Sequence, residues 1–242
     1  MRKAWMVICL LILCGCVPAS PHMEAVTALS VIAVPAEQGD VTESVFFRCD
    51  QAVRSAEVTA LEDLQGEQLG TPAFHTASLE EVEDGLYMLC FYVNRMTGGT
   101  AYHFDGVWVQ IETVSGQQEL FIPGEHRLSA EAKDAFADWR DGAFLSDSGA
   151  FLPDMFLGED DVLKRIETLD GRATVIADKT LPCPAEACGP LSLSIQTKAP
   201  YEAYSGNLRI IWERDGVEHS AIVPIIRSWH YRDEALDIEN GR

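Results

Sequence analysis

The feature that most constrains this chain is a series of short segments in which apolar and polar residues alternate. Leu191, Leu193 and Ile195, for example, are separated by single polar residues. Successive side chains of a strand point to opposite faces, so this spacing predicts strands with one buried face. Comparable runs, rich in Val, Phe and Tyr, are bounded by Gly, Asp and Asn. They cover residues 25–34, 41–49, 56–61, 85–93, 107–114, 120–123, 173–177, 191–197, 208–214 and 217–229.

The strands are predicted to form two β regions. Short strands with regular turn signals predict a β-sandwich over residues 24–123, which resembles an immunoglobulin-like domain in outline. It departs from true immunoglobulin domains because Trp108 follows both cysteines of the region and does not lie between them. Ser115-Gly116 and Asp215-Gly216 are predicted hairpin turns. A second antiparallel region is expected over residues 172–231, either as its own sheet or as an extension of the first.

The middle of the chain, residues 124–171, is expected to be helical or irregular. Ser129 is a helix-capping residue type and Glu131 falls in the first turn, so a short amphipathic helix is predicted over residues 129–140. Its apolar face would carry Ala132, Ala135, Phe136 and Trp139. A second helix is predicted over residues 160–169, with Val162, Leu163 and Ile166 inward and Gly171 as its terminator. Residues 232–242 are expected to form a polar tail.

The first residues of the chain have the proportions of an export signal. Arg2 and Lys3 precede a run of uncharged residues, 4–13, which is too short to cross a membrane as a helix. The run ends Leu13-Cys14-Gly15-Cys16, which resembles the lipobox of bacterial lipoproteins. The resemblance implies a signal peptide over residues 1–15, cleavage after Gly15, and a membrane anchor of acyl chains such as palmitate on Cys16. Residues 16–23 would then be a linker. An ordinary secretory leader is the alternative.

The residue after Cys16 bears on location. In enteric bacteria an aspartate at this place keeps a lipoprotein in the inner membrane, and here the residue is Val17. The resemblance therefore implies an outer-membrane anchor with the body facing the periplasm. That compartment is oxidising, which favours disulfide bonds.

Four cysteines remain in the exported part, and they are expected to form two bridges. Strand alternation places Cys49 and Cys90 on faces that point into a core, and we predict that they pair. Cys183 and Cys188 flank a turn-rich loop whose ends lie within bridging reach, and we predict a second bridge there. Zinc ligation would need closer spacing and further thiolates or histidines, so no metal is expected.

The chain is strongly acidic, with 38 Asp and Glu against 18 Lys and Arg and a net charge of −20. Such a surface repels nucleic acid and anionic lipid headgroups. It suits a basic protein partner, although solubility alone also explains it.

Motifs with a known chemistry are missing from the sequence. It contains no G-x-S-x-G, P-loop, G-x-G-x-x-G or H-E-x-x-H pattern, and its six histidines lack metal-ligand spacing. The acidic runs 80–84 and 159–161 lack the spacing of a calcium loop and are predicted to be solvated loops. We therefore expect neither a cofactor nor catalysis. Aromatic residues favour interfaces, so Tyr102, Tyr201 and Tyr204 are candidate partner-binding residues, whereas Trp108 is expected in the core.

One further resemblance concerns residues 41–114. The order of VFFRC, GLYMLC and YHFDGVWV after a lipobox is similar to small periplasmic lipoproteins regarded as type VI secretion immunity proteins. That resemblance implies a β-sandwich that binds and neutralises a toxin in the periplasm. Three hypotheses follow: a non-catalytic protein-binding lipoprotein, a structural or assembly lipoprotein of the outer membrane or cell wall, and a hydrolase whose residues are dispersed along the sequence.

Overall fold

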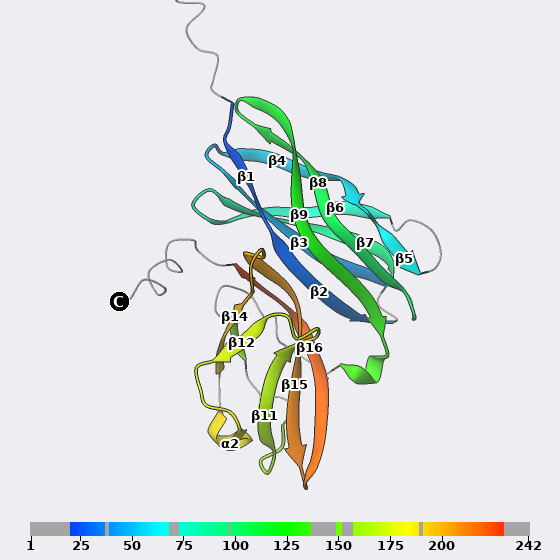
Figure 1. Ribbon diagram of the computed structural model, residues 1–242, viewed down its shortest axis with the longest axis vertical. Helices are drawn as coiled ribbons and strands as arrows, with labels where there is room; N and C mark the ends of the chain where they lie inside the picture. Colours follow the sequence, from blue (N-terminus) through cyan, green and yellow to red (C-terminus); the bar gives the residue numbers. More distant parts are fainter. Residues whose placement is uncertain are drawn as a thin grey trace, which may run out of the picture.

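The computed structural model describes residues 20–36, 39–67, 73–96, 98–136, 149–151, 157–188 and 191–229. The fold is mainly β, as the sequence predicts, and its strands form three sheets. Figure 1 shows two lobes that meet near the middle of the molecule. The N-terminal lobe comprises β1 to β9 and the C-terminal lobe comprises β10 to β16.

The first sheet, sheet A, contains four antiparallel strands of the N-terminal lobe in the order β1-β3-β7-β6. Its strands are β1 (Met23–Val26), β3 (Gly39–Cys49), β7 (Leu86–Met96) and β6 (Phe74–Glu83).

Sheet B runs through both lobes in the order β13-β11-β15-β2-β9-β8-β4, with β16 beside β15 and β5 beside β8. Strand β2 pairs in parallel with β9 on one side and with β15 on the other, which joins the lobes. Its strands are β2 (Ala28–Pro35), β4 (Val53–Glu62), β5 (Gln65–Glu67), β8 (Ala101–Thr113), β9 (Gly116–Glu131), β11 (Val162–Thr168), β13 (Cys183–Pro184), β15 (Ala203–Arg214) and β16 (Val217–Trp229).

Sheet C is small and belongs to the C-terminal lobe. It has the order β10-β14-β12, formed by β10 (Gly149–Phe151), β14 (Leu191–Gln196) and β12 (Thr174–Ala177). The described chain also forms a 3-10 helix, η1 (Lys133–Ala135), and one short helix, α2 (Ala185–Cys188). None of the described helices is long and apolar enough to span a membrane.

The two larger hydrophobic cores lie on opposite faces of sheet B. Ile32 and Val34 of β2 belong to the core that sheet B shares with sheet A. Leu29 and Val31 of the same strand belong to the core that sheet B shares with sheet C. Since alternate residues of a strand face opposite sides, β2 is buried on both faces, which explains its continuous apolar sequence. Sheet B therefore runs through both lobes and is covered by a hydrophobic core on each face.

Several predicted elements have different bounds in the structure. The run 25–34 is two strands, because the chain passes from sheet A to sheet B at Thr27. The runs 107–114 and 120–123 belong to the longer β8 and β9, and the predicted boundary at residue 123 falls inside β9. The turn between β8 and β9 is Val114-Ser115, one residue earlier than predicted. The Asp215-Gly216 turn is confirmed, and both of its residues have positive φ.

The helix predicted over residues 129–140 is wrong for the residues that the structure describes. Residues up to Glu131 continue β9, because β2 supplies a paired strand along that whole stretch. Only Lys133–Ala135 form a helical turn, and residues 137–140 lie outside the described chain. Tertiary pairing here outweighs the helical spacing of the apolar residues.

The helix predicted over residues 160–169 is also wrong, since Val162–Thr168 form β11. The strand has a bulge between Leu163 and Arg165. A bulge inserts one extra residue, so the inward side chains of Leu163 and Ile166 are three positions apart, as they would be on a helix. The spacing that indicated a helix therefore results from an irregular strand.

Strand β6 is the longest of the strands that the sequence did not predict. Glu80–Glu83, expected in a solvated acidic loop, belong to β6, an edge strand of sheet A. Charged residues are common on edge strands because they discourage pairing with other chains. The acidic residues obscured the strand pattern, although Phe74 and Leu79 pack against the core between sheets A and B and Val82 packs against a smaller buried cluster.

Candidate functional site

A concave surface lies where the two lobes meet, and we call it the junction groove. It consists of two adjoining pockets of about 630 and about 320 Å³. Val31, Arg127 and Ser129 line both of them. The larger pocket is completed by Gln65, Ala101, Tyr102, His103 and Leu128. The smaller one is completed by Glu131, Ala135, Leu169, Asp170, Arg209, Ser220, Ala221 and Ile222.

Strand register explains how the N-terminal lobe forms its side of the groove. Gln65 of β5 pairs with His103 of β8, His103 pairs with Arg127 of β9, and Arg127 pairs with Val31 of β2. Residues paired across strands share a face, so these four side chains form one row across sheet B. His126 alternates to the opposite face and is fully buried, whereas Arg127 is exposed in the groove.

The C-terminal lobe supplies the second side through β15 and β16. Arg209 is half-buried and lies opposite Ile222 of β16 and Glu167 of β11. The chain after η1 reaches this wall through a single bridge between Phe136 and Ile222. Arg209 forms no ion pair with any other described residue, whereas Glu167 lies 3.4 Å from Arg165 Nε.

An ionic network beside the groove connects the lobes. Glu125 of β9 accepts hydrogen bonds from Arg172 Nη1 at 2.6 Å and from the Tyr201 hydroxyl at 2.8 Å. Its other oxygen lies 2.6 Å from Arg127 Nη2. Arg172 Nε also donates to Asp170 at 2.6 Å. Arg172 and Tyr201 belong to the C-terminal lobe, so Glu125 links the two lobes directly.

Titration properties of the network follow from these contacts. The hydrogen bond from Arg172, assisted by the one from Tyr201, lowers the pKa of Glu125 to about 2. Burial, together with the neighbouring Glu125 carboxylate, raises the pKa of Tyr201. The Glu125 carboxylate raises the pKa of Arg172 as well. Glu125 is therefore ionised at any ordinary pH and holds Arg127 at the edge of the groove.

A buried polar row lies inside the molecule, on the other face of sheet B. Ser205 of β15 pairs with Ser30 of β2, and Ser30 pairs with His126 of β9. From sheet A, Glu43 of β3 reaches this row, and none of the four side chains is exposed. Glu43 accepts hydrogen bonds from the Ser30 hydroxyl at 2.9 and 2.7 Å and from the Ser44 amide at 2.7 Å.

The residue types of this row are those of a serine hydrolase, but their arrangement differs. In a catalytic triad the serine hydroxyl donates to histidine and the histidine donates to the carboxylate. Here the Ser30 hydroxyl donates to Glu43 directly, and both His126 nitrogens lack a hydrogen-bond partner within the described chain. Glu43 lies 3.5 Å from His126 Nδ1 and the ring stacks on Phe104. With no exposed surface, the row has no contact with a substrate.

The structure separates the three predicted partner-binding tyrosines. Tyr204 is 0% exposed, which contradicts its assignment as a surface anchor, whereas Tyr102 is 4% exposed and lines the larger pocket of the junction groove, so its part in partner binding stays a prediction. Tyr204 belongs to the C-terminal core and donates its hydroxyl to the Asn207 carbonyl oxygen at 3.1 Å. Tyr201 is half-buried and faces the ionic network, with Arg172 over its ring at 5.9 Å. Trp108 is only half-buried, and its indole donates to Glu62 at 2.7 Å.

Of the two predicted disulfides, one is present. Cys183 and Cys188 are bonded, whereas Cys49 and Cys90 are free and buried. Cys90 lies opposite Ser44, five positions from Cys49, which corresponds to roughly 16 Å along a strand. Cys90 faces the same side of sheet A as its partner Ser44, whereas Cys49 faces the same side as Val45. The two thiols therefore lie on opposite faces of the sheet. Both thiols are buried, but only Cys49 belongs to the core between sheets A and B, so the two cannot meet. The predicted lipidation site, Cys16, lies outside the described residues.

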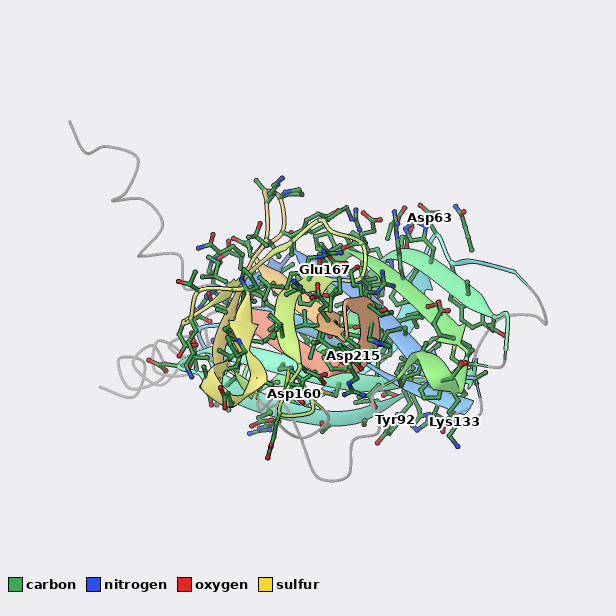
Figure 2. All side chains as sticks on the ribbon, turned by 90° about the horizontal axis from the view of Figure 1, so that it is seen from below. Asp63, Tyr92, Lys133, Asp160, Glu167 and Asp215 are labelled. Atoms are coloured by element: carbon green, nitrogen blue, oxygen red, sulfur yellow. A yellow bond between two sulfur atoms is a disulfide. The ribbon has the colours of Figure 1, made fainter. Side chains whose placement is uncertain are left out.

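The acidic residues do not gather into an ion site. No group of described His, Cys, Asp and Glu side chains has the arrangement of a metal site. Figure 2 shows the labelled carboxylates Asp63, Asp160, Glu167 and Asp215 at separate places on the molecule. In the run 159–161, Asp161 is buried and accepts two hydrogen bonds from Arg214, at 2.7 and 2.5 Å, which lower its pKa. It therefore fixes a loop to β15.

Sequence reasoning missed the charged residues at the junction groove. Arg127, Arg209 and Glu125 lie on strands whose sheet partners are distant in sequence, and nothing in their local pattern marks them. A signal was present at Glu125-His126-Arg127, because a strand that continues past residue 123 must alternate these side chains between faces. Because that strand was predicted to end at residue 123, the alternation of these three residues was not used.

Comparison with known proteins adds no family. No protein-family model matches the chain, and no curated protein matches it. Among solved structures, the chain is similar to the cadherin-like domains 1 to 4 of zebrafish RET, with 9% identity, a TM-score of 0.25, and coverage of 87% of this chain and 51% of that one. An endo-fucoidan hydrolase of glycoside hydrolase family 107 gives 11% identity, a TM-score of 0.23 and coverage of 86% and 28%. A protein of unknown function from Porphyromonas gingivalis W83 gives 11% identity, a TM-score of 0.20, and coverage of 87% of this chain and 99% of that one. The chain thus spans about half of the first of these structures and less of the second, and likenesses at these TM-scores carry no argument about function.

Proposed function

We propose that this chain is a lipoprotein of the cell envelope, anchored to the outer membrane through Cys16, and that its β body binds a protein partner without catalysing a reaction. The observation that carries the proposal is the junction groove, a concave surface to which both lobes contribute. Neutralisation of a toxin in the periplasm is the sharpest form of this function. In this proposal the two packed sheet pairs act as immunoglobulin-like modules that present the groove.

The construction of the groove supports binding. Its walls are mainly strands of one sheet, and the Glu125 network joins them from opposite lobes. Side chains on paired strands are held more firmly than those on loops, so the surface is preorganised and loses little entropy on binding. Its volume falls in the range of about 300 to 1,000 Å³ that is usual for ligand pockets.

The buried row supports binding over turnover. Ser30, Glu43 and His126 are the residue types that a cryptic hydrolase would need, and they lie together with no exposed surface. A nucleophile and base must come within about 3 Å of the reacting atoms, which requires access for the substrate. The contact of Glu43 with Ser30 instead holds sheet A against sheet B.

The charge of the chain sets the expected behaviour of the complex. Outside the groove the acidic surface would attract basic regions of a partner and speed association. Exposed charges are screened within about 8 Å at physiological ionic strength, so the complex should weaken as salt rises.

The anchor is tested by Cys16→Ser. The variant should lose incorporation of a fatty-acid analogue and should either retain its leader or appear in the soluble fraction. Cys49→Ser is the matched control, because it removes a buried thiol that has no role in the anchor. Normal labelling of the Cys16→Ser protein would contradict the lipoprotein proposal.

Binding is tested with a substitution that fills the groove. Ser129 lines both pockets, so Ser129→Trp should reduce capture of the partner from envelope extract at least tenfold. Ser194→Trp places the same bulk on an exposed position of β14, away from the groove, and should leave capture unchanged. Equal capture by both variants would show that the partner binds elsewhere.

Turnover is tested on the same preparation. We expect no hydrolysis of ester, peptide or glycan substrates above a blank. Hydrolysis abolished by His126→Phe or by another single substitution of a serine, histidine or carboxylate would show that the chain is an enzyme. A captured cell-wall or outer-membrane component, in place of a secreted toxin, would indicate an assembly role.

A further inference from the structure

We propose that the junction groove binds a carboxylate-bearing peptide segment of the partner, and that Arg209 is the residue that pairs with the carboxylate. This inference rests on the proposed function and names the chemistry of its site. It also reverses the expectation from net charge for this one surface, because an acidic chain presents there an arginine that none of the described carboxylates pairs with.

Arg209 stands apart from the other described arginines of the C-terminal lobe. Arg172 is held by Glu125 and Asp170, and Arg214 is held by Asp161. Arg209 lines the smaller pocket, is half-buried, and has no ion pair within the part of the chain that the structure describes. Its cross-strand neighbour Glu167 lies beside Arg165 instead. A half-buried guanidinium without a carboxylate loses hydration without compensation, so an incoming carboxylate would be favoured.

Arg127 provides a second cation in the same pocket. One of its terminal nitrogens lies 2.6 Å from Glu125, and its side chain is 52% exposed. A guanidinium has five N–H donors, so this contact leaves further donors for a ligand. Because Glu125 is ionised at any ordinary pH, its contact keeps Arg127 at the groove edge. Glu125 is therefore a positioning residue for the site.

The surrounding polar groups favour a peptide carboxylate over a phosphate group. Ser129 and Ser220 offer hydroxyl groups that suit peptide amides and carbonyls. Glu131 and Asp170 line the same pocket and would repel a doubly charged phosphate group more than a single side-chain carboxylate. An arginine fork matches the planar geometry of a carboxylate, which carries a single charge.

The experiment measures binding of two fluorescent peptides, hexaglutamate and hexaglutamine, to the purified chain by fluorescence anisotropy. Hexaglutamate should bind at least tenfold more tightly. Arg209→Gln should then weaken hexaglutamate binding about tenfold to a hundredfold, the range for loss of a hydrogen bond to a charged group. Arg209→Lys keeps the positive charge but lacks the planar guanidinium that can donate two parallel hydrogen bonds. Its affinity for hexaglutamate should therefore lie between those of the wild-type chain and Arg209→Gln. The melting temperature of each variant shows that it is folded.

Arg54→Gln is the matched control. Arg54 is an exposed arginine on β4, which pairs with the end of β8 that is remote from the groove residues Ala101 and His103. The Arg54→Gln variant should bind hexaglutamate as tightly as the wild-type chain does. Equal binding of the two peptides, no binding of hexaglutamate, or equal losses in Arg54→Gln and Arg209→Gln would overturn the inference. Arg209-dependent binding of phosphatidylglycerol vesicles without peptide binding would also overturn it and assign the groove to headgroups.

The outcomes separate this inference from the proposed function. If the envelope partner is captured equally by the wild-type chain and Arg209→Gln, the carboxylate site is wrong and protein binding stands. If hexaglutamate binds through Arg209 but no partner is captured from envelope extract, the site exists and the proposed function fails.

Discussion

At the scale of single residues, the clearest feature is Glu43, a carboxylate with no exposed surface between two sheets. Both of its oxygens lie within hydrogen-bond distance of the single Ser30 hydroxyl, one of them accepts from the Ser44 amide, and His126 Nδ1 lies 3.5 Å away. A buried carboxylate is costly unless its oxygens are satisfied, so these contacts are needed for the sheets to pack. Glu43 thus connects sheet A to the strand that joins the lobes.

We expect Glu43→Ala to lower the free energy of unfolding by about 3–5 kcal/mol, because it leaves buried donors without an acceptor. Glu43→Gln keeps an acceptor and should cost less. Glu57→Ala, on the exposed face of β4, should change stability by no more than about 0.5 kcal/mol. Urea unfolding followed by circular dichroism measures all three, and similar values for Glu43→Ala and Glu57→Ala would contradict the assigned role.

The pH dependence of stability should report on Glu125. Its pKa is lowered in the folded chain to about 2 from 4.5, so it contributes stability above pH 4.5 that is lost as the pH falls towards 2. After allowance for solvent screening, Glu125→Gln should cost about 1–3 kcal/mol at pH 7 and much less at pH 2. Urea unfolding at pH 2, 3, 5 and 7 tests this, and an equal cost at every pH would show that the carboxylate charge has no role.

At the scale of elements, the segment Cys183–Cys188 is a short loop closed by a disulfide beside a helix of one turn. Closing so small a loop restricts the unfolded chain only modestly. Replacing both cysteines with alanine should lower the free energy of unfolding by about 2 kcal/mol. Chemical denaturation without reductant gives the value, and a loss above about 5 kcal/mol would mean that the bridge is needed for the fold.

The register between β3 and β7 predicts that the other two cysteines are free thiols. Peptide mapping without reduction should find a 183–188 link and free thiols at Cys49 and Cys90. Because both thiols are buried, alkylation should be slow in the native chain and fast in denaturant. A 49–90 link would show that the register between β3 and β7 is wrong.

At the scale of the whole molecule, the lobes share sheet B, and β2 contributes to a core on each face. Unfolding one lobe would remove a sheet partner and expose one apolar face of β2. We therefore expect a single cooperative transition in calorimetry, with agreement between the calorimetric and van't Hoff enthalpies. Two resolved transitions would show that the lobes are independent units in spite of the common sheet.

The sequence by itself determined the features that depend on neighbours along the chain. Alternation predicted most strands, Asp215-Gly216 predicted its hairpin, and the short spacing of Cys183 and Cys188 predicted their bridge, because each signal acts over a few residues. The lipobox is of the same kind and stays a prediction.

Only the tertiary structure decided which strands pair and in which register. Pairing of β2 with β9 and β15 joins segments far apart in sequence, and a register cannot be read from alternation alone, since a shift of one residue reverses every face. Register separated Cys49 from Cys90, buried Tyr102 and Tyr204, and brought Arg127 and Arg209 to one groove. The bulge in β11 likewise arises from pairing with β15 and gave a strand the apolar spacing of a helix.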